Sequence, residues 1–271
     1  QETGGYVRGE KAYEDSDLRT TNPNPEAYRD AWSLRLNSEW SRDAWTLKPY
    51  IRRSQMAFLQ HFLPGQPLEE NDQSSIGMIV ERGLSTATTR LSMGGQIEMM
   101  SGGLREYQDQ PTTGSRFLVT TRPAGLHYDY DVTSTMFAAF YNLDYSLSVD
   151  TRLVHSLRAE SLRYDYTNNH IVGNTKDDGT ACGFGGCLYT RPASREDEFT
   201  NLGARFGIER DAQMGTIYLT ASSGFRPPQI TELYRLRGGQ TIADLNSERL
   251  SALEIGVRNE GIAIAAFVEN T

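Results

Sequence analysis

The sequence has no long hydrophobic run. Only 38% of its 271 residues are hydrophobic, the mean hydropathy is −0.54, and no stretch approaches the roughly 18 consecutive apolar residues that a membrane-spanning helix needs. These values exclude a helical membrane protein. They leave a spanning β-barrel open, because barrel strands alternate apolar and polar residues and the average hydropathy then resembles that of a soluble protein.

An excess of positive charge is also missing. Lys and Arg number 27 against 35 Asp and Glu, which gives a formal net charge of −8. A surface that binds nucleic acid neutralises phosphates with a basic face, so nucleic acid is excluded as a partner. Tyr (14), Phe (10) and Gly (25) are frequent. Because aromatic residues are enriched in strands, this composition indicates a β-rich fold.

Cysteine is limited to Cys182 and Cys187, in the sequence Cys-Gly-Phe-Gly-Gly-Cys. The three glycines let the loop return to disulfide distance, and a disulfide fits an oxidising compartment such as the periplasm or the cell surface. Half of a zinc site is the alternative, but Cys-x4-Cys without a companion pair of Cys or His is a weak metal signal. We therefore predict a disulfide, no protein metal site and no cofactor.

The motifs of common enzymes are absent from the sequence. It has no Gly-x-Ser-x-Gly, no His-Glu-x-x-His and no glycine-rich phosphate loop. His155 and Ser156 are adjacent in an alternating segment, so their side chains point to opposite faces of a strand and cannot act together. The sequence predicts that the protein is not an enzyme.

A two-residue alternation of apolar and polar side chains recurs along the chain. Residues 201–209 and 216–222 alternate around a turn at 211–215, and residues 252–258 and 262–268 alternate around a turn at 259–261. This period is typical of antiparallel hairpins. Similar patterns predict further strands, about ten in all, at residues 32–37, 44–58, 75–83, 87–98, 133–145 and 150–166.

The connections between these strands alternate in length. Short turns are separated by long polar or Gly/Pro-rich loops at about 59–74, 99–132, 167–197 and 226–247. A soluble sandwich usually spreads its loop lengths over both ends, whereas transmembrane barrels have short turns at one end and long loops at the other. We predict an all-β fold, an antiparallel transmembrane β-barrel, with strands of about 11 residues.

The alternation also predicts which side chains face lipid. A charge at the lipid midplane costs about 2–4 kcal/mol, so charged positions should face the lumen. We expect Glu254 and Arg258 to share the inward face of their strand and to pair across the lumen wall. Lipid-facing positions would include Leu202, Phe206, Leu253 and Ile255, and other lumen-facing positions Arg205 and Glu209.

Three segments carry a resemblance to a known family. A strand ends in Gly224-Phe225-Arg226-Pro227-Pro228, and residues 245–258 then match the pattern Leu-x-x-Glu-x-x-x-x-x-Glu-x-Gly-x-Arg. Upstream, residues 157–166 are similar to a Gly-Leu-Arg-Tyr-Asp strand without its glycine. Together they resemble the barrel of TonB-dependent outer-membrane receptors, closely over about the last 140 residues and loosely before them.

This resemblance implies a location in the Gram-negative outer membrane and a role in active transport. Residues 1–271 would form part of a single barrel domain and supply about 10 of its roughly 22 strands, with the N-terminal plug and the final strands outside. The receptor would take up a ferric siderophore or another metal chelate, energised through the TonB protein, in contact with outer-membrane lipid. A passive outer-membrane channel and a soluble glycan-binding β-sandwich are the alternatives.

Long loops that combine arginine with aromatic residues are the candidates for contact with a chelate. Arginine complements an anionic ligand and tyrosine offers stacking area. His127, Asp129 and Asp131 alternate and could share a face, but such side chains in a polar loop are usually solvated, so no metal site is predicted. The candidate ligand contacts are Arg122, His127, Tyr128 and Tyr130 in the loop at 99–132, and Arg226, Tyr234, Arg235 and Arg237 in the loop at 226–247.

Overall fold

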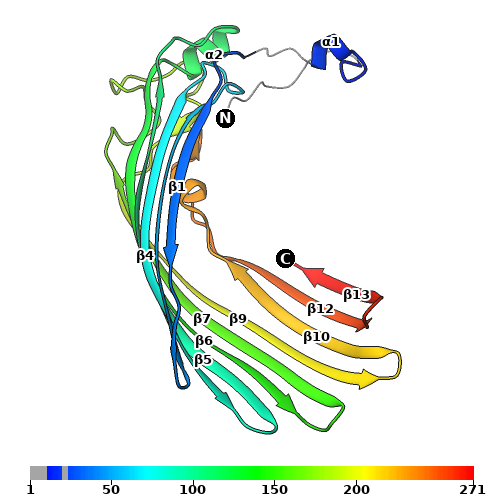
Figure 1. Cartoon of the computed structure of the whole chain (residues 1–271). Coiled ribbons are helices and arrows are strands. Elements are labelled where there is room, and N and C mark those ends of the chain that lie inside the picture. The colour runs from blue at the N-terminus through cyan, green and yellow to red at the C-terminus, as the bar shows by residue number, and fades with distance from the viewer. Residues whose placement is uncertain (1–10, 20–23) are drawn as a thin grey trace.

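A computed structural model describes residues 11–19 and 24–271, and it shows one strongly curved antiparallel sheet (Figure 1). Ten strands pair in chain order, and the short β2 (Trp40–Arg42) extends the hairpin of β1 and β3. Ten strands in one antiparallel sheet confirm the predicted architecture, and this single layer excludes a sandwich of two stacked sheets. The ten are β1 (Arg29–Asn37), β3 (Trp45–Leu59), β4 (Leu68–Ser85), β5 (Thr89–Gln108), β6 (Gly125–Ser146), β7 (Thr151–Asn168), β9 (Arg195–Ala212), β10 (Gly215–Arg226), β12 (Glu248–Arg258) and β13 (Ala263–Asn270).

The two ends of the sheet differ in their connections, as the sequence predicts. Tight turns join the strands at the lower end in Figure 1, and the long connections lie at the upper end. The long connections hold α2 (Arg116–Thr121), α3 (Ile230–Tyr234), β8 (Tyr189–Thr190) and β11 (Leu236–Arg237), and α1 (Ser16–Arg19) precedes the sheet. Of the helices in the described ranges, none is long and apolar enough to cross a membrane.

The strands are longer than the predicted 11 residues: β4 to β7 and β9 have 18 to 22 residues each. They continue past the apolar belt. On β5 the outward positions are apolar as far as Met99 and then become Ser101, Gly103 and Arg105. The predicted loops at 59–74 and 99–132 were therefore too long, because β4 begins at Leu68, β5 ends at Gln108 and β6 begins at Gly125.

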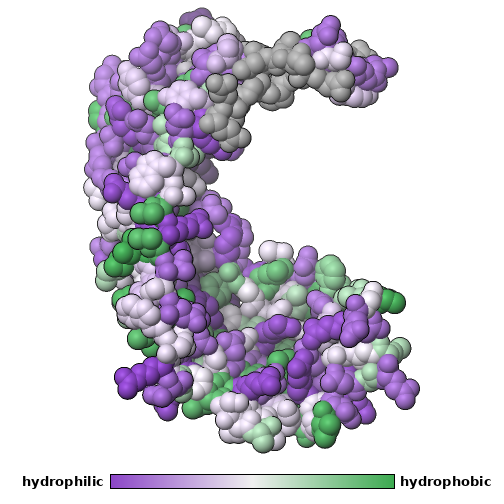
Figure 2. Space-filling model, in the orientation of Figure 1, coloured by the Kyte–Doolittle hydropathy of each residue, from purple (hydrophilic) through white to green (hydrophobic). Residues whose placement is uncertain are grey.

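Apolar side chains cover the convex face. Leu202, Phe206, Leu253 and Ile255 are 50%, 52%, 48% and 55% exposed, and no second layer covers them. Figure 2 shows hydrophobic residues along the outer side of the curve. This exposure is what a lipid-facing belt requires and what a dry core between two sheets would not show.

Charged residues of the later strands lie on the other face, but they do not pair as predicted. Tyr218 donates its hydroxyl hydrogen to Glu254 Oε1 at 2.5 Å, and Arg258 Nη2 donates to Glu209 Oε2 at 2.8 Å. The predicted pair of Glu254 with Arg258 is wrong. Residues four apart on one strand are about 13 Å apart, whereas neighbours across strands are within about 5.5 Å.

Two glycines let tyrosine rings lie flat against the inner wall. A Cβ on Gly77 would lie 2.3 Å from Cζ of Tyr50, and one on Gly256 would lie 2.6 Å from Cζ of Tyr218. The hydroxyl of Tyr50 reaches Glu98 on β5 at 2.5 Å. Glycine at these positions therefore lets each ring lie over its neighbouring strand.

The buried core is confined to the long-loop end of the inner, concave face. It consists mainly of aromatic side chains of β6, β7 and β9, and α3 packs on them. Because this core lies beyond the apolar belt, it anchors the loops to the wall. Its members include Leu104, Tyr128, Tyr130, Val132, Leu162, Tyr164, Tyr166, Phe199, Leu233 and Tyr234.

Candidate functional site

The connection after β10 folds back onto the inner wall. Its helix α3 places Tyr234 against Tyr166, with the two rings stacked at 4.2 Å between centroids. The Tyr234 hydroxyl donates to Asp197 Oδ2 at 2.8 Å, and Tyr234 is fully buried. Burial, together with this carboxylate, raises the pKa of Tyr234, so the side chain stays a neutral donor. The loop at 227–247 is thus fixed against β7 and β9.

Four charged side chains and one histidine continue this attachment across β4, β5 and β6: Glu69, Glu106, Arg122, Arg235 and His127. We call them the mouth network. Arg235 Nη1 donates to Glu69 Oε2 at 2.7 Å, and Arg235 Nη2 donates to Glu106. Since Arg235 directly follows α3 whereas its partners lie on β4 and β5, this one guanidinium ties the loop to two wall strands.

Glu106 is the centre of the mouth network and only 1% exposed. It receives Arg122 Nη2 at 3.3 Å and contacts His127 Nδ1 at 3.0 Å. Burial opposes ionisation of this carboxyl, but the hydrogen bond with His127 and the positive charges of Arg235 and Arg122 outweigh it and lower its pKa. Three cationic or donor groups around one buried carboxylate keep it charged.

His127 has acceptors on both sides of its ring. Nε2 lies 2.8 Å from the carbonyl oxygen of Pro123, which can only accept, so Nε2 carries a hydrogen. Nδ1 lies within hydrogen-bond distance of the Glu106 carboxylate. His127 stacks on Tyr189 with 4.3 Å between ring centroids. The histidine therefore joins the wall to the β7–β9 connection.

The two longest connections also bind each other. Leu236 and Arg237 of β11 pair with Thr190 and Tyr189 of β8. Tyr128 on β6 donates its hydroxyl hydrogen to the Leu236 carbonyl oxygen at 2.6 Å. Burial raises the pKa of Tyr128 and preserves this donor. The loops at 169–194 and 227–247 thus form one interlocked body at the mouth.

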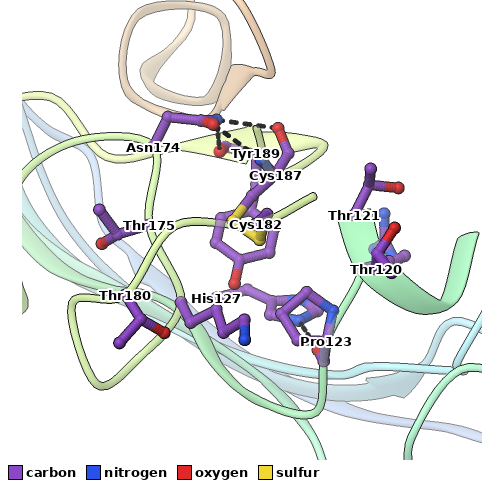
Figure 3. The surroundings of a disulfide bond; sticks show 12 residues. Thr120, Thr121, Pro123, His127, Asn174, Thr175, Thr180, Cys182, Cys187 and Tyr189 are labelled. Carbon is purple, nitrogen blue, oxygen red and sulfur yellow. Dashed lines mark hydrogen bonds between the residues drawn. A yellow bond between two sulfur atoms is a disulfide. The ribbon is translucent and has the colours of Figure 1, made fainter. Parts of the chain in front are cut away.

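A disulfide closes a small hairpin in the first of these loops (Figure 3). Cys182 and Cys187 are bonded, with 5.1 Å between their Cα atoms. Asn174 holds the hairpin from outside: its Oδ1 accepts from the Cys187 amide at 2.7 Å and its Nδ2 donates to the Cys187 carbonyl at 2.8 Å. Phe184, at the tip, has a positive φ of 51° and is 60% exposed.

Arg191 is a buried cation that the sequence analysis missed. It is 1% exposed, and its guanidinium donates to the carbonyl oxygens of His127 at 3.1 Å and Thr175 at 2.8 Å. Among the described residues it has no carboxylate within ion-pair distance. The signal in the sequence is weak, because an arginine between Thr190 and Pro192 in a polar loop looks solvated.

The structure separates the eight candidate ligand contacts into two groups. Arg122, His127, Tyr128, Tyr130 and Tyr234 are buried, and the side chain of Arg235 is 25% exposed. These six hold the loops in place. His127, Tyr128 and Tyr130 lie on β6 and not in a loop. Arg226 and Arg237 are solvent-facing, although Arg226 is paired with Glu232 at 3.1 Å and Glu248 at 2.8 Å.

His127, Asp129 and Asp131 alternate along β6, but their side chains do not come together as three metal ligands. A register shift between Glu106 and Tyr107 lies at this point of the β5–β6 pairing, and His127 contacts Glu106. Asp131 instead accepts from Asn169 at 2.6 Å. Within residues 11–19 and 24–271, no group of three His, Cys, Asp or Glu side chains is placed to hold a metal ion.

Solved structures of transport receptors share this fold. The copper transporter OprC superposes with a TM-score of 0.62 at 14% identity, over 90% of this chain and 39% of that one. The ferric-catecholate import receptor Fiu from E. coli K12 gives 0.59 at 13% identity, over 93% and 43%. The siderophore receptor PiuA from Acinetobacter baumannii gives 0.57 at 12% identity, over 88% and 39%. No curated relative matches the sequence.

The chain spans about two fifths of the length of these solved structures. At such low identity they establish the curved barrel wall and nothing finer. The family model for the TonB-dependent receptor-like β-barrel matches residues 2–269, which is nearly the whole chain. Because this match agrees with the strand order, the outward apolar belt and the one-sided loops, the chain belongs to the TonB-dependent receptor-like β-barrel family.

Proposed function

We propose that the chain forms part of the wall and mouth of an outer-membrane receptor that imports a ferric siderophore or similar metal chelate with energy supplied through TonB. The family match over residues 2–269 carries this proposal. The solved structures with this fold include receptors described as importing ferric catecholate and ferric citrate, and one copper transporter. Ferric chelates are thus the first class to test, and copper the second.

The loops at the mouth support this role through their rigidity. The mouth network, the Tyr166–Tyr234 stack and the β8–β11 pair fix the base of the loops before any ligand arrives. A preorganised site loses less conformational freedom on binding. The exposed guanidinium of Arg237, which forms no ion pair among the described residues, is the best-placed cation for an anionic chelate.

Uptake of radiolabelled iron by intact cells tests the proposal. Cells that depend on this receptor should lose accumulation of at least one ferric chelate when its gene is deleted. They should lose it equally when TonB is deleted or the inner membrane is uncoupled. Uptake that persists without TonB would favour a passive channel, and unchanged uptake of all iron and copper chelates after deletion of the receptor gene would refute transport.

A pair of variants tests the contact residue. Arg237→Ala should raise the chelate concentration at half-maximal uptake about tenfold, since one charge-assisted hydrogen bond contributes about 1.5–3 kcal/mol. Arg226→Ala, whose guanidinium is already shared by Glu232 and Glu248, serves as the control and should change this concentration less than threefold. Equal effects of the two substitutions would remove Arg237 from the proposed site.

A further inference from the structure

The outward face of the sheet has an apolar groove across β1, β3, β4 and β5. Its volume is about 510 Å³. Leu36, Ile51, Ile76 and Met99 face each other in one cross-strand row. Because these side chains face away from the lumen, a groove here is open to lipid. The apolar side chains that line it are Leu36, Ile51, Ile76, Met78, Ile97 and Met99.

An exposed arginine stands at the long-loop end of this groove. Arg53 occupies the next outward row, between Leu34 on β1 and Ser74 on β4, with Ser101 following on β5. Its guanidinium lies over the Trp32 ring at 5.7 Å from the centroid, and it forms no ion pair within the described part of the chain. An unneutralised cation beside two hydroxyl groups is suited to a phosphate.

The position of Arg53 along its strand places it at a membrane surface. Trp45 lies at the turn end of β3, eight residues before Arg53. Eight residues span about 26 Å, or roughly 20 Å vertically at a tilt of 35–45°. The apolar band of an outer-membrane barrel is about 25 Å tall with aromatic residues at both edges. Trp45 and Trp32 mark the two edges, and Arg53 lies just inside the upper one.

A polar hollow of about 620 Å³ continues directly above Arg53. Ala57 and Gly103 leave this space, and the side chains around it include Asp30, Asp72 and Asp131. These carboxylates would repel a second phosphate but accept hydrogen bonds from sugar hydroxyls. Three features therefore follow one another along the outward face toward the loops. They are the apolar groove, the Arg53 cation with its two neighbouring serine hydroxyls, and the carboxylates of the hollow.

We propose that this face binds a phosphorylated glycolipid of the outer leaflet. One acyl chain lies in the groove, a phosphate contacts Arg53, and sugar hydroxyls donate to the carboxylates of the hollow. The proposal rests on the proposed outer-membrane location for its lipid and its orientation. It assigns to the outward face a ligand separate from the chelate bound at the mouth.

The test measures binding of rough lipopolysaccharide, which lacks the long O-polysaccharide, to the full receptor purified and delipidated in detergent. Native mass spectrometry reports the bound lipid. Arg53→Glu should weaken binding at least tenfold, consistent with loss of a charged hydrogen bond. Arg82→Glu is the matched control, because Arg82 lies over Trp45 at 5.3 Å at the opposite edge of the belt, and it should leave binding unchanged.

Two further comparisons identify the parts of the ligand. Filling the groove with Ile76→Trp should also weaken binding at least tenfold, and enzymatic removal of the phosphates should abolish the difference between wild type and Arg53→Glu. Phosphatidylglycerol, which has phosphate and acyl chains but only a glycerol head, should bind at least tenfold more weakly. Equal binding of both lipids, or equal effects of Arg53→Glu and Arg82→Glu, would overturn the proposal.

Heat-modifiable migration on gels confirms that each variant is a folded barrel, and Arg53→Gln replaces Arg53→Glu if the latter fails to fold. Chelate uptake by the same variants separates the two proposals. Loss of glycolipid binding by Arg53→Glu with normal uptake supports a lipid site independent of transport. Absence of glycolipid binding by the wild type, with uptake intact, refutes the lipid site alone.

Discussion

Replacing Arg235 with leucine should release the loop at 227–247 from the inner wall while the barrel stays folded. The substitution leaves Glu69 and Glu106 without the guanidinium that bridges them. Removing one partner of a buried ion pair costs about 3–5 kcal/mol. We take the lower value, about 3 kcal/mol, because Glu106 keeps its ion pair with Arg122 and its contact with His127.

The consequence should be local, since the strands keep their backbone ladder. Amide hydrogen exchange of the full receptor measures it directly. A loss of about 3 kcal/mol in the closed state corresponds to roughly 150-fold faster exchange in α3 and β11, where local opening governs exchange. Protection in β9 and β10 should stay within a factor of about three.

Arg226→Leu is the control for this experiment. Arg226 also bridges two carboxylates, Glu232 and Glu248, but its side chain is 42% exposed. Exposed ion pairs contribute about 0–1 kcal/mol, so exchange in α3 should rise less than about fivefold. Unchanged exchange in Arg235→Leu, or a loss of protection spread over all strands, would show that the mouth network does not hold the loop.

Three other perturbations have definite outcomes. The pKa of Glu106 is lowered in the fold, so the contribution of its ionised form to loop stability is complete above the usual value of 4.5 and is lost as the pH falls further. A spin label at Gln240→Cys should therefore stay immobile from pH 8 to 5 and become mobile below about pH 4. Label mobility that changes between pH 8 and 5 instead would contradict this assignment. Leu253→Arg should destabilise the barrel by about 2–4 kcal/mol in denaturant titrations in lipid, because it places a charge in the lipid-facing belt. Glu254→Gln keeps an acceptor for Tyr218 and should cost less than about 1 kcal/mol. Equal costs of the two substitutions would contradict the assigned faces. Replacing both Cys182 and Cys187 with serine should destabilise only the hairpin around Phe184, by about 2 kcal/mol. Proteolysis at this hairpin should become faster while the melting temperature of the barrel stays unchanged. A lower melting temperature of the barrel would show that the disulfide stabilises the whole fold.

The sequence predicts the strands of the apolar belt because one rule governs them. Each outward side chain meets hydrocarbon and each inward one meets polar surroundings, so Leu253, Glu254 and Ile255 can be assigned to faces by alternation alone. Short turns and long loops follow from the same constraint, since a strand that has crossed the membrane must turn back.

The same rule fails beyond the belt, where water replaces lipid outside. There Asp129 and Asp131 alternate with Tyr128 and Tyr130, with tyrosine buried under the loops. This is still a period of two, but its apolar face now points inward, and the alternating carboxylates suggest a solvated loop. The inversion explains why β6 was expected to begin at residue 133 and begins at Gly125.

The mouth network could not be predicted from the sequence for a different reason, because its interacting residues are distant along the chain. Arg235 and Glu106 are 129 residues apart, and Arg235 and Glu69 are 166 apart. Residue type alone identified Arg122, His127 and Arg235 as unusual, but assigned them to ligand contact. In the structure all three surround the buried carboxylate of Glu106.

That reassignment changes where ligand specificity should be sought. A guanidinium already shared between two buried carboxylates cannot bind a chelate without leaving them uncompensated, which costs more than one new hydrogen bond returns. We therefore expect contacts with the proposed chelate from side chains that the interlocked loops expose, such as Arg237 and Phe184, while Arg235 and Glu106 set how firmly those side chains are held. Substitutions in the mouth network should then alter the affinity for all chelates together, whereas substitutions at exposed positions should alter the preference among them.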